Sequence, residues 1–268
     1  MHRLALCALL ALAAPARAHD YWLVPDTFTP KPKAPVNVRL FVGEELKAEQ
    51  ELPFTAKKTR ISELATARDS EPLAEAKVGT KPAFSLALPG AGTAVLRVDR
   101  DWSHITLKAD KFTAYLKEEG LSHIVEAREK AGAANADASE RYRRCLKALL
   151  HGGTPDGAAT RQLGQVFEIV PTKDPYTLKA GDVLPMKVLF ENKPLAGQKV
   201  TAFHRAGDTV TSVSATTDKT GAAEFKLTKG GVWLVRGVHM RRVTEKNPAP
   251  AADWESFWAS VTFELPAK

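Results

Sequence analysis

Short segments with alternating polar and apolar residues occupy the first third of the chain. Val36–Val42, Phe84–Leu88 and Ala94–Asp99 each alternate with a period of two residues, which is typical of strands that bury one face. Glycine and proline residues separate these segments, and Gly43 in particular predicts a turn directly after the first of them. The pattern predicts an antiparallel β-sandwich over residues 19–109.

A helical period replaces the alternation in the region 110–151, which we predict to be a helical insertion. Apolar residues at helical spacing predict two short helices there. These residues are Phe112, Tyr115 and Leu116 in the first helix and Leu121, Ile124 and Val125 in the second. Gly120 predicts the end of the first helix, because glycine commonly follows the last helical residue.

The last part of the insertion also has helical spacing. Asp137 and Glu140 resemble a capping box, which marks a helix start. The apolar residues that follow predict one buried helix face, and they are Tyr142, Cys145, Leu146 and Leu149. We therefore predict a third helix, in which Cys145 is a small buried hydrophobic residue rather than a reactive thiol.

Strand-like segments return in the region 166–268. Six segments are candidate strands, namely Val183–Phe190, Lys199–Phe203, Val210–Thr217, Ala223–Leu227, Val232–Met240 and Phe257–Leu265. The whole chain is therefore predicted to be dominated by β-structure. We expect two antiparallel β-sandwich domains, immunoglobulin-like or transthyretin-like, with the helical insertion between them.

Composition excludes several classes of protein. The 268 residues are 44% hydrophobic and 26% charged, which is typical of a folded globular chain. The two cysteines are too few for a disulfide-stapled small fold. The formal net charge is +7, but basic and acidic residues are interspersed, so we expect no nucleic-acid partner. No motif of a hydrolase, zinc protease or nucleotide-binding enzyme occurs, and we therefore predict no enzymatic activity.

Residues 1–18 have the pattern of a secretory signal peptide. Arg3 supplies the positive charge, and the apolar stretch Leu4–Ala14 is too short to cross a bilayer core of about 30 Å. The small residues of Ala16–Ala18 fit a cleavage site. We therefore expect cleavage between Ala18 and His19 and a periplasmic or secreted protein.

Cleavage at this position would make His19 the first residue of the mature chain. Its α-amine and its imidazole Nδ1 could then chelate one metal ion, and a nitrogen-rich open site favours Cu(II) or Ni(II). A second imidazole would complete the site. Any of the five other histidines of the mature chain could supply it, namely His104, His123, His151, His204 and His239, although each of them also fits an ordinary core or surface position. Of these we select His239 and His104 as candidate ligands.

The predicted mature start resembles that of the DUF4198 family, described as a periplasmic component of cobalt and nickel uptake systems. The resemblance begins with His19–Pro25. It continues through segments similar to the family's later signatures, which are Lys111-Phe112 with Tyr115–Leu121, Glu140–Tyr142 with Cys145–Ala148, and Gly230–Val235 followed by His239 and Phe257–Phe263. The resemblance implies an exported β-sandwich protein that handles a transition metal, with His19 and His239 as the matching metal-binding positions.

We therefore expect a periplasmic protein that binds a divalent transition metal (Cu, Ni or Co) for uptake or delivery, with a membrane metal transporter as a partner. Two alternatives remain open. The sandwiches could be a non-catalytic adhesion or carbohydrate-binding scaffold, with Trp254 and Trp258 as contact residues. The terminal chelate could instead activate oxygen, as in oxidative polysaccharide-cleaving copper enzymes.

Overall fold

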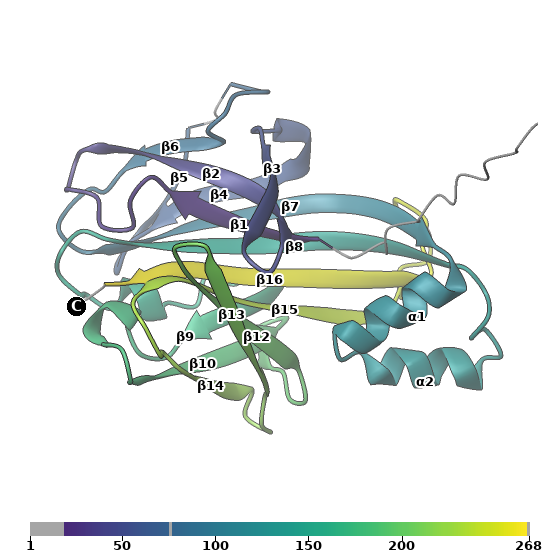
Figure 1. Cartoon of the computed structure of the whole chain (residues 1–268). Helices are drawn as coiled ribbons and strands as arrows, with labels where there is room; N and C mark the ends of the chain where they lie inside the picture. The colour runs from purple at the N-terminus through teal and green to yellow at the C-terminus, as the bar shows by residue number, and fades with distance from the viewer. Residues whose placement is uncertain (1–18, 75–76, 267–268) are drawn as a thin grey trace, which may run out of the picture.

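Three layers of β-sheet make up the described part of the protein. The computed structural model describes residues 19–74 and 77–266, so the predicted signal peptide lies outside the described residues. Figure 1 shows one sheet of long strands in the middle, a smaller sheet on each side of it, and two helices at one end. The prediction of a mainly β, sandwich-type fold is confirmed.

The central sheet has eight strands, in the order β13–β12–β15–β16–β8–β7–β4–β5. Their bounds along the chain are β4 (Thr59–Ala65), β5 (Ser70–Pro72), β7 (Thr93–Leu107), β8 (Ala138–His151), β12 (Lys199–Ala206), β13 (Thr209–Thr216), β15 (Gly231–Arg242) and β16 (Trp254–Leu265). β8 and β16 pair in parallel, and the other neighbours pair antiparallel. Strands from both predicted sandwich regions thus share one sheet. The domain boundaries stay a prediction.

Each outer sheet has four strands. The first outer sheet contains β1 (Asp20–Pro25), β2 (Pro35–Glu44), β3 (Lys47–Leu52) and β6 (Phe84–Ala87). The second contains β9 (Phe167–Pro171), β10 (Val183–Phe190), β11 (Lys193–Pro194) and β14 (Ala222–Lys226). The strands predicted from alternation are therefore present in all three sheets.

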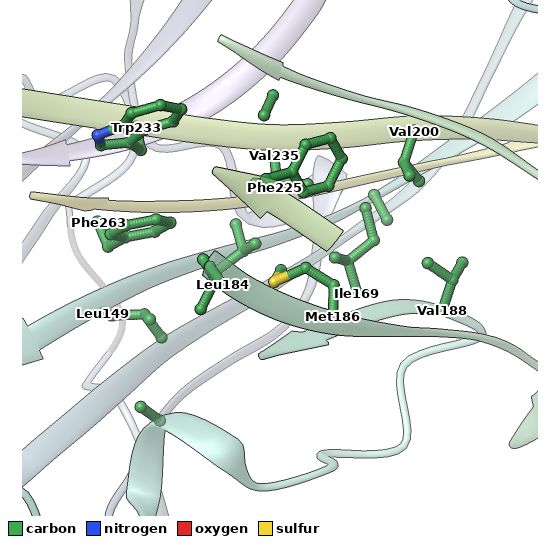
Figure 2. Close-up of a cluster of buried hydrophobic side chains, with 14 of the residues drawn as sticks. Leu149, Ile169, Leu184, Met186, Val188, Val200, Phe225, Trp233, Val235 and Phe263 are labelled. Atoms are coloured by element: carbon green, nitrogen blue, oxygen red, sulfur yellow. The ribbon is translucent and has the colours of Figure 1, made fainter. Parts of the chain in front are cut away.

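The central sheet is buried on both faces. Successive side chains of a strand point to opposite faces, so β8 packs against both outer sheets. Leu146 and Leu150 join the cluster under the first outer sheet, while Cys145 and Leu149 join the cluster under the second. Figure 2 shows this second cluster, with Ile169, Met186 and Phe225 of the second outer sheet facing the central strands.

Burial on both faces explains why the prediction of a third helix is wrong. The segment predicted as a helix from its capping box and apolar spacing is strand β8. Because both of its faces lie in cores, apolar residues occupy consecutive positions and the period of two is lost. Asp137 caps a different helix, since its carboxylate accepts a hydrogen bond from the backbone N–H of Ala109 at 3.3 Å. Cys145 is buried as predicted, and burial raises the pKa of its thiol to about 12.

The two other predicted helices are confirmed. They are α1 (Ala109–Glu118) and α2 (Ser122–Lys130), and Gly120 lies between them with a φ of +73°. Their apolar faces are buried against β15 and β16. No helix in the described part of the chain is both long enough and apolar enough to cross a membrane.

Candidate functional site

The start of β1 is fixed to the central sheet by three contacts. The buried carboxylate of Asp20 forms an ion pair with Arg236 of β15, at 3.1 Å from its Nε. Arg144 of β8 donates a hydrogen bond to the carbonyl of His19 at 2.8 Å, and Ser260 of β16 donates to the carbonyl of Tyr21 at 3.0 Å. His19 therefore has a defined position relative to the rest of the protein.

The hairpin between β2 and β3 brings acidic side chains to the same place. Its two turn residues, Glu45 and Leu46, have φ values of 53° and 60°, which suits a tight two-residue hairpin turn. A leucine in this conformation is strained. The strain is offset because the Leu46 side chain is fully buried in a cluster with Trp22 and Leu234.

A β-bulge next to this turn changes the direction of one acidic side chain. The register between β2 and β3 shifts between Val42 and Gly43, which leaves Glu49 without a direct partner on β2. A Cβ atom at Gly43 would lie 2.1 Å from the carbonyl oxygen of Lys47 and 2.9 Å from the backbone nitrogen of Glu49. Only glycine fits this close approach of two backbones. Gly43, which we predicted as a turn residue, thus lies within β2 and makes the bulge possible.

The result is a cluster of His19, Glu44 and Glu49. One ligand atom of each lies within 4.8 Å of the others. The imidazole Nε2 of His19 is 2.9 Å from a carboxylate oxygen of Glu49. The side chains of His19 and Glu49 are 42% and 53% exposed, so the cluster opens to solvent. Imidazole and carboxylate groups are common ligands of divalent transition metals.

The two acidic members were missed by the sequence analysis. Glu44 and Glu49 belong to a charged segment whose sequence fits an ordinary solvent-exposed hairpin and gives no sign of a metal site. The one signal in the sequence for their position was the alternation of Val36–Val42. It predicts a strand that leads into a turn, and therefore a hairpin at these residues. Which side chains of that hairpin meet His19 depends on strand pairing and on the bulge.

His239 lies on the other side of the central sheet. Its half-buried ring is 4.3 Å from that of Phe190, centroid to centroid, and Phe190 packs against the core under the second outer sheet. Arg236, three residues earlier on β15, points to the opposite face, where it pairs with Asp20. The structure instead brings His239 near His123, with ring centroids 6.5 Å apart. In the described ranges, the cluster around His19 does not include His239.

His104 is exposed on β7, opposite Arg141 of β8. The next residue, Ile105, lines a cavity together with His19. Because adjacent residues of a strand face opposite sides, His104 points away from His19. The structure therefore brings together His19 with two carboxylates and brings neither His239 nor His104 to it. Metal binding by these two histidines stays a prediction.

The environment of His239 predicts a pH dependence of stability. Burial, with nearby His123 and Arg241, lowers the pKa of His239 from 6.5 to about 4. The folded protein therefore binds this proton less readily than the unfolded chain, and stability that is present above pH 6.5 is lost as the pH falls toward 4. We expect the free energy of unfolding of the wild-type protein to fall between pH 7 and pH 5 by about 2 kcal/mol more than that of His239→Gln. Urea unfolding at the two pH values measures this difference.

The matched control is His104→Gln, which removes an exposed histidine from β7. This variant should keep the pH dependence of the wild-type protein. If the unfolding free energy of His239→Gln fell with decreasing pH as steeply as that of the wild-type protein, the pKa of His239 would not be lowered in the folded protein.

The tryptophans of the alternative scaffold hypothesis do not form an exposed surface. Trp254 and Trp258 are 2% and 5% exposed and pack with α1 and α2. The prediction that they form an exposed contact surface is therefore wrong. The apolar spacing of β16, which is buried on both faces, gives no sign of which aromatic residues reach the surface.

Comparisons with known proteins identify a family but no function. A family model described as "Domain of unknown function (DUF4198)" matches residues 16–241. No curated protein matches the chain.

Proposed function

The chain belongs to the DUF4198 family, and we propose that its processed form binds a divalent transition-metal ion at the site of His19, Glu44 and Glu49. One observation carries the proposal. The residue that is expected to begin the mature chain lies beside two carboxylates, with one ligand atom of each residue within 4.8 Å of the others. A nitrogen and oxygen donor set of this kind suits Cu, Ni or Co.

Processing would add the decisive ligand. In the precursor the backbone nitrogen of His19 is part of a peptide bond to Ala18, and an amide of this kind is a poor ligand. After cleavage it becomes an α-amine, which can chelate an ion together with the imidazole Nδ1. In this arrangement Glu49 accepts a hydrogen bond from Nε2 and orients the ring, as carboxylates next to metal-bound imidazoles usually do, while Glu44 is the carboxylate that would bind the ion.

Fixed geometry would make the chelate usable. A free peptide terminus must lose conformational freedom when it binds an ion. Here the contacts of Asp20, Arg144 and Ser260 already hold the first residues of β1 in place. The two carboxylates would compensate the charge of the ion, and the exposure of His19 and Glu49 would allow the ion to enter and leave.

Export and metal transfer form the rest of the proposal. Cleavage between Ala18 and His19 would release the protein into the periplasm or outside the cell. Bound reversibly at an open site, the ion could be passed to or from a membrane metal transporter. We propose a role in metal uptake or delivery and no catalysis.

Metal titration of two proteins tests the proposal. One begins at His19, and the other carries one additional alanine before it. By isothermal titration calorimetry with Ni²⁺ or Cu²⁺, the extended protein should bind at least about tenfold more weakly, because the extra residue removes the amine ligand. Unchanged affinity in the extended protein would rule out the terminal chelate.

Variants of the carboxylates complete the test. Glu44→Gln and Glu49→Gln should each weaken binding in the protein that begins at His19, while His104→Gln should bind like the wild-type protein. Weaker binding in the glutamine variants together with unchanged affinity in the extended protein would assign the ion to the side chains alone. Amino-terminal sequencing of the exported protein must give His19 as the first residue.

A further inference from the structure

A cavity lies directly beneath His19, between the first outer sheet and the central sheet. Its volume is about 140 Å³. A cavity of similar size, about 150 Å³, holds a benzene-sized molecule in another protein. Apolar side chains line part of the wall, among them Val42, Ile105 and Leu107. The cavity is therefore large enough for a small organic molecule with an apolar body.

A buried guanidinium group lies in the wall of this cavity. Arg144 of β8 is 7% exposed. Its Nη2 donates to the carbonyl of His19, but Nε and Nη1 have no hydrogen-bond partner in the described part of the chain. Burial lowers the pKa of Arg144, which shows that the surroundings compensate its charge incompletely. A buried charge with free donors is costly unless a ligand of opposite charge meets it.

Three aromatic rings lie close to this guanidinium group. The central carbon of the Arg144 guanidinium lies 3.8 Å from the ring centroid of Tyr21, 4.8 Å from that of Tyr142 and 5.1 Å from that of Trp258. Such contacts orient the planar group. A guanidinium group held in this way can attract a carboxylate by its charge and donate a hydrogen bond to it.

The acidic residue of the cavity does not oppose a negative ligand strongly. Glu140 is 3% exposed and accepts hydrogen bonds from Tyr115 at 3.2 Å and from Ser256. Burial raises its pKa to about 7, so a large share of Glu140 is uncharged at neutral pH. Glu140 therefore compensates the positive charge of Arg144 only in part.

We infer that this cavity binds a small organic carboxylate, with its carboxylate next to the guanidinium of Arg144 and its apolar body between the aromatic and aliphatic wall residues. The inference goes beyond metal binding and does not depend on it. His19 belongs to both sites, but the carboxylate is held by Arg144 rather than by a metal ion.

Binding of butyrate and benzoate tests this site, with butyramide and benzamide as uncharged controls of the same shape. The full mature chain is titrated by calorimetry in buffer freed of metal ions with a chelating resin. We expect at least one of the carboxylates to bind, and its amide to bind at least tenfold more weakly. Metal-free conditions keep the outcome separate from that of the proposed metal site.

Two variants locate the bound carboxylate. Arg144→Met should weaken binding at least tenfold, and Arg242→Met, which removes an exposed arginine from β15, should not. Because loss of Arg144 also removes its contact to His19, Ile105→Trp provides a second variant. Ile105 is 39% exposed at the cavity wall, so a larger ring there should block the cavity without unfolding the protein.

Three results would overturn the inference. They are no binding of either carboxylate, equal binding of carboxylate and amide, and binding that survives both Arg144→Met and Ile105→Trp. In the first case the cavity holds only solvent, and in the last the carboxylate binds elsewhere on the protein.

Discussion

Replacing Lys147 by methionine is expected to lower the free energy of unfolding by about 3–5 kcal/mol. Lys147 of β8 and Glu168 of β9 are 3% and 0% exposed and form an ion pair at 2.5 Å between the central and second outer sheets. Methionine fills a similar volume but leaves the carboxylate without its counter-charge in the interior. Urea unfolding at neutral pH measures the loss.

A second variant separates the lost charge from lost packing. Glu168 also accepts hydrogen bonds from the backbone N–H groups of Leu163 and Gly164, at 2.6 and 2.9 Å. The double variant Lys147→Met/Glu168→Gln removes both charges and keeps an acceptor for one of these donors. It should therefore be more stable than Lys147→Met alone.

An exposed pair gives the matched control. Lys108 and Asp137 form an ion pair at 2.8 Å on the surface, and Lys108→Met should leave stability nearly unchanged. If Lys147→Met lowered the free energy of unfolding no more than Lys108→Met, the charge of Glu168 would not need Lys147 for its compensation.

Replacing Gly43 by alanine is expected to cost about 3 kcal/mol of stability or more and to weaken metal binding at least about tenfold. The new Cβ would overlap the carbonyl oxygen of Lys47, and no side-chain rotation can relieve an overlap between backbones. Moving β3 would also move Glu49 away from His19. Urea unfolding and Ni²⁺ titration of the protein that begins at His19 measure the two effects.

Gly90→Ala is the matched control for this substitution. A Cβ atom at Gly90 meets nothing within 4 Å, so alanine should be tolerated there in both measurements. If Gly43→Ala behaved like Gly90→Ala, the bulge would not be needed to position the metal site.

The sequence predicted those elements whose two faces lie in different surroundings. β2 alternates because one face meets a core and the other is partly exposed, and α1 has one buried stripe of Phe112, Tyr115 and Leu116. β8 has no such contrast. Its local pattern fits a helix as well as a strand, and only the two outer sheets that cover it decide between them.

The sequence by itself determined the family, the β-rich fold class and the choice of His19 as a candidate ligand. Tertiary structure decided which side chains meet that residue. Strand pairing and the bulge at Gly43 place Glu44 and Glu49 beside His19, while the alternation of β15 turns His239 to the opposite face. The physical reason is that a side chain's direction depends on the register of its strand. Register is set by partners distant in the chain, and local residue patterns do not contain it.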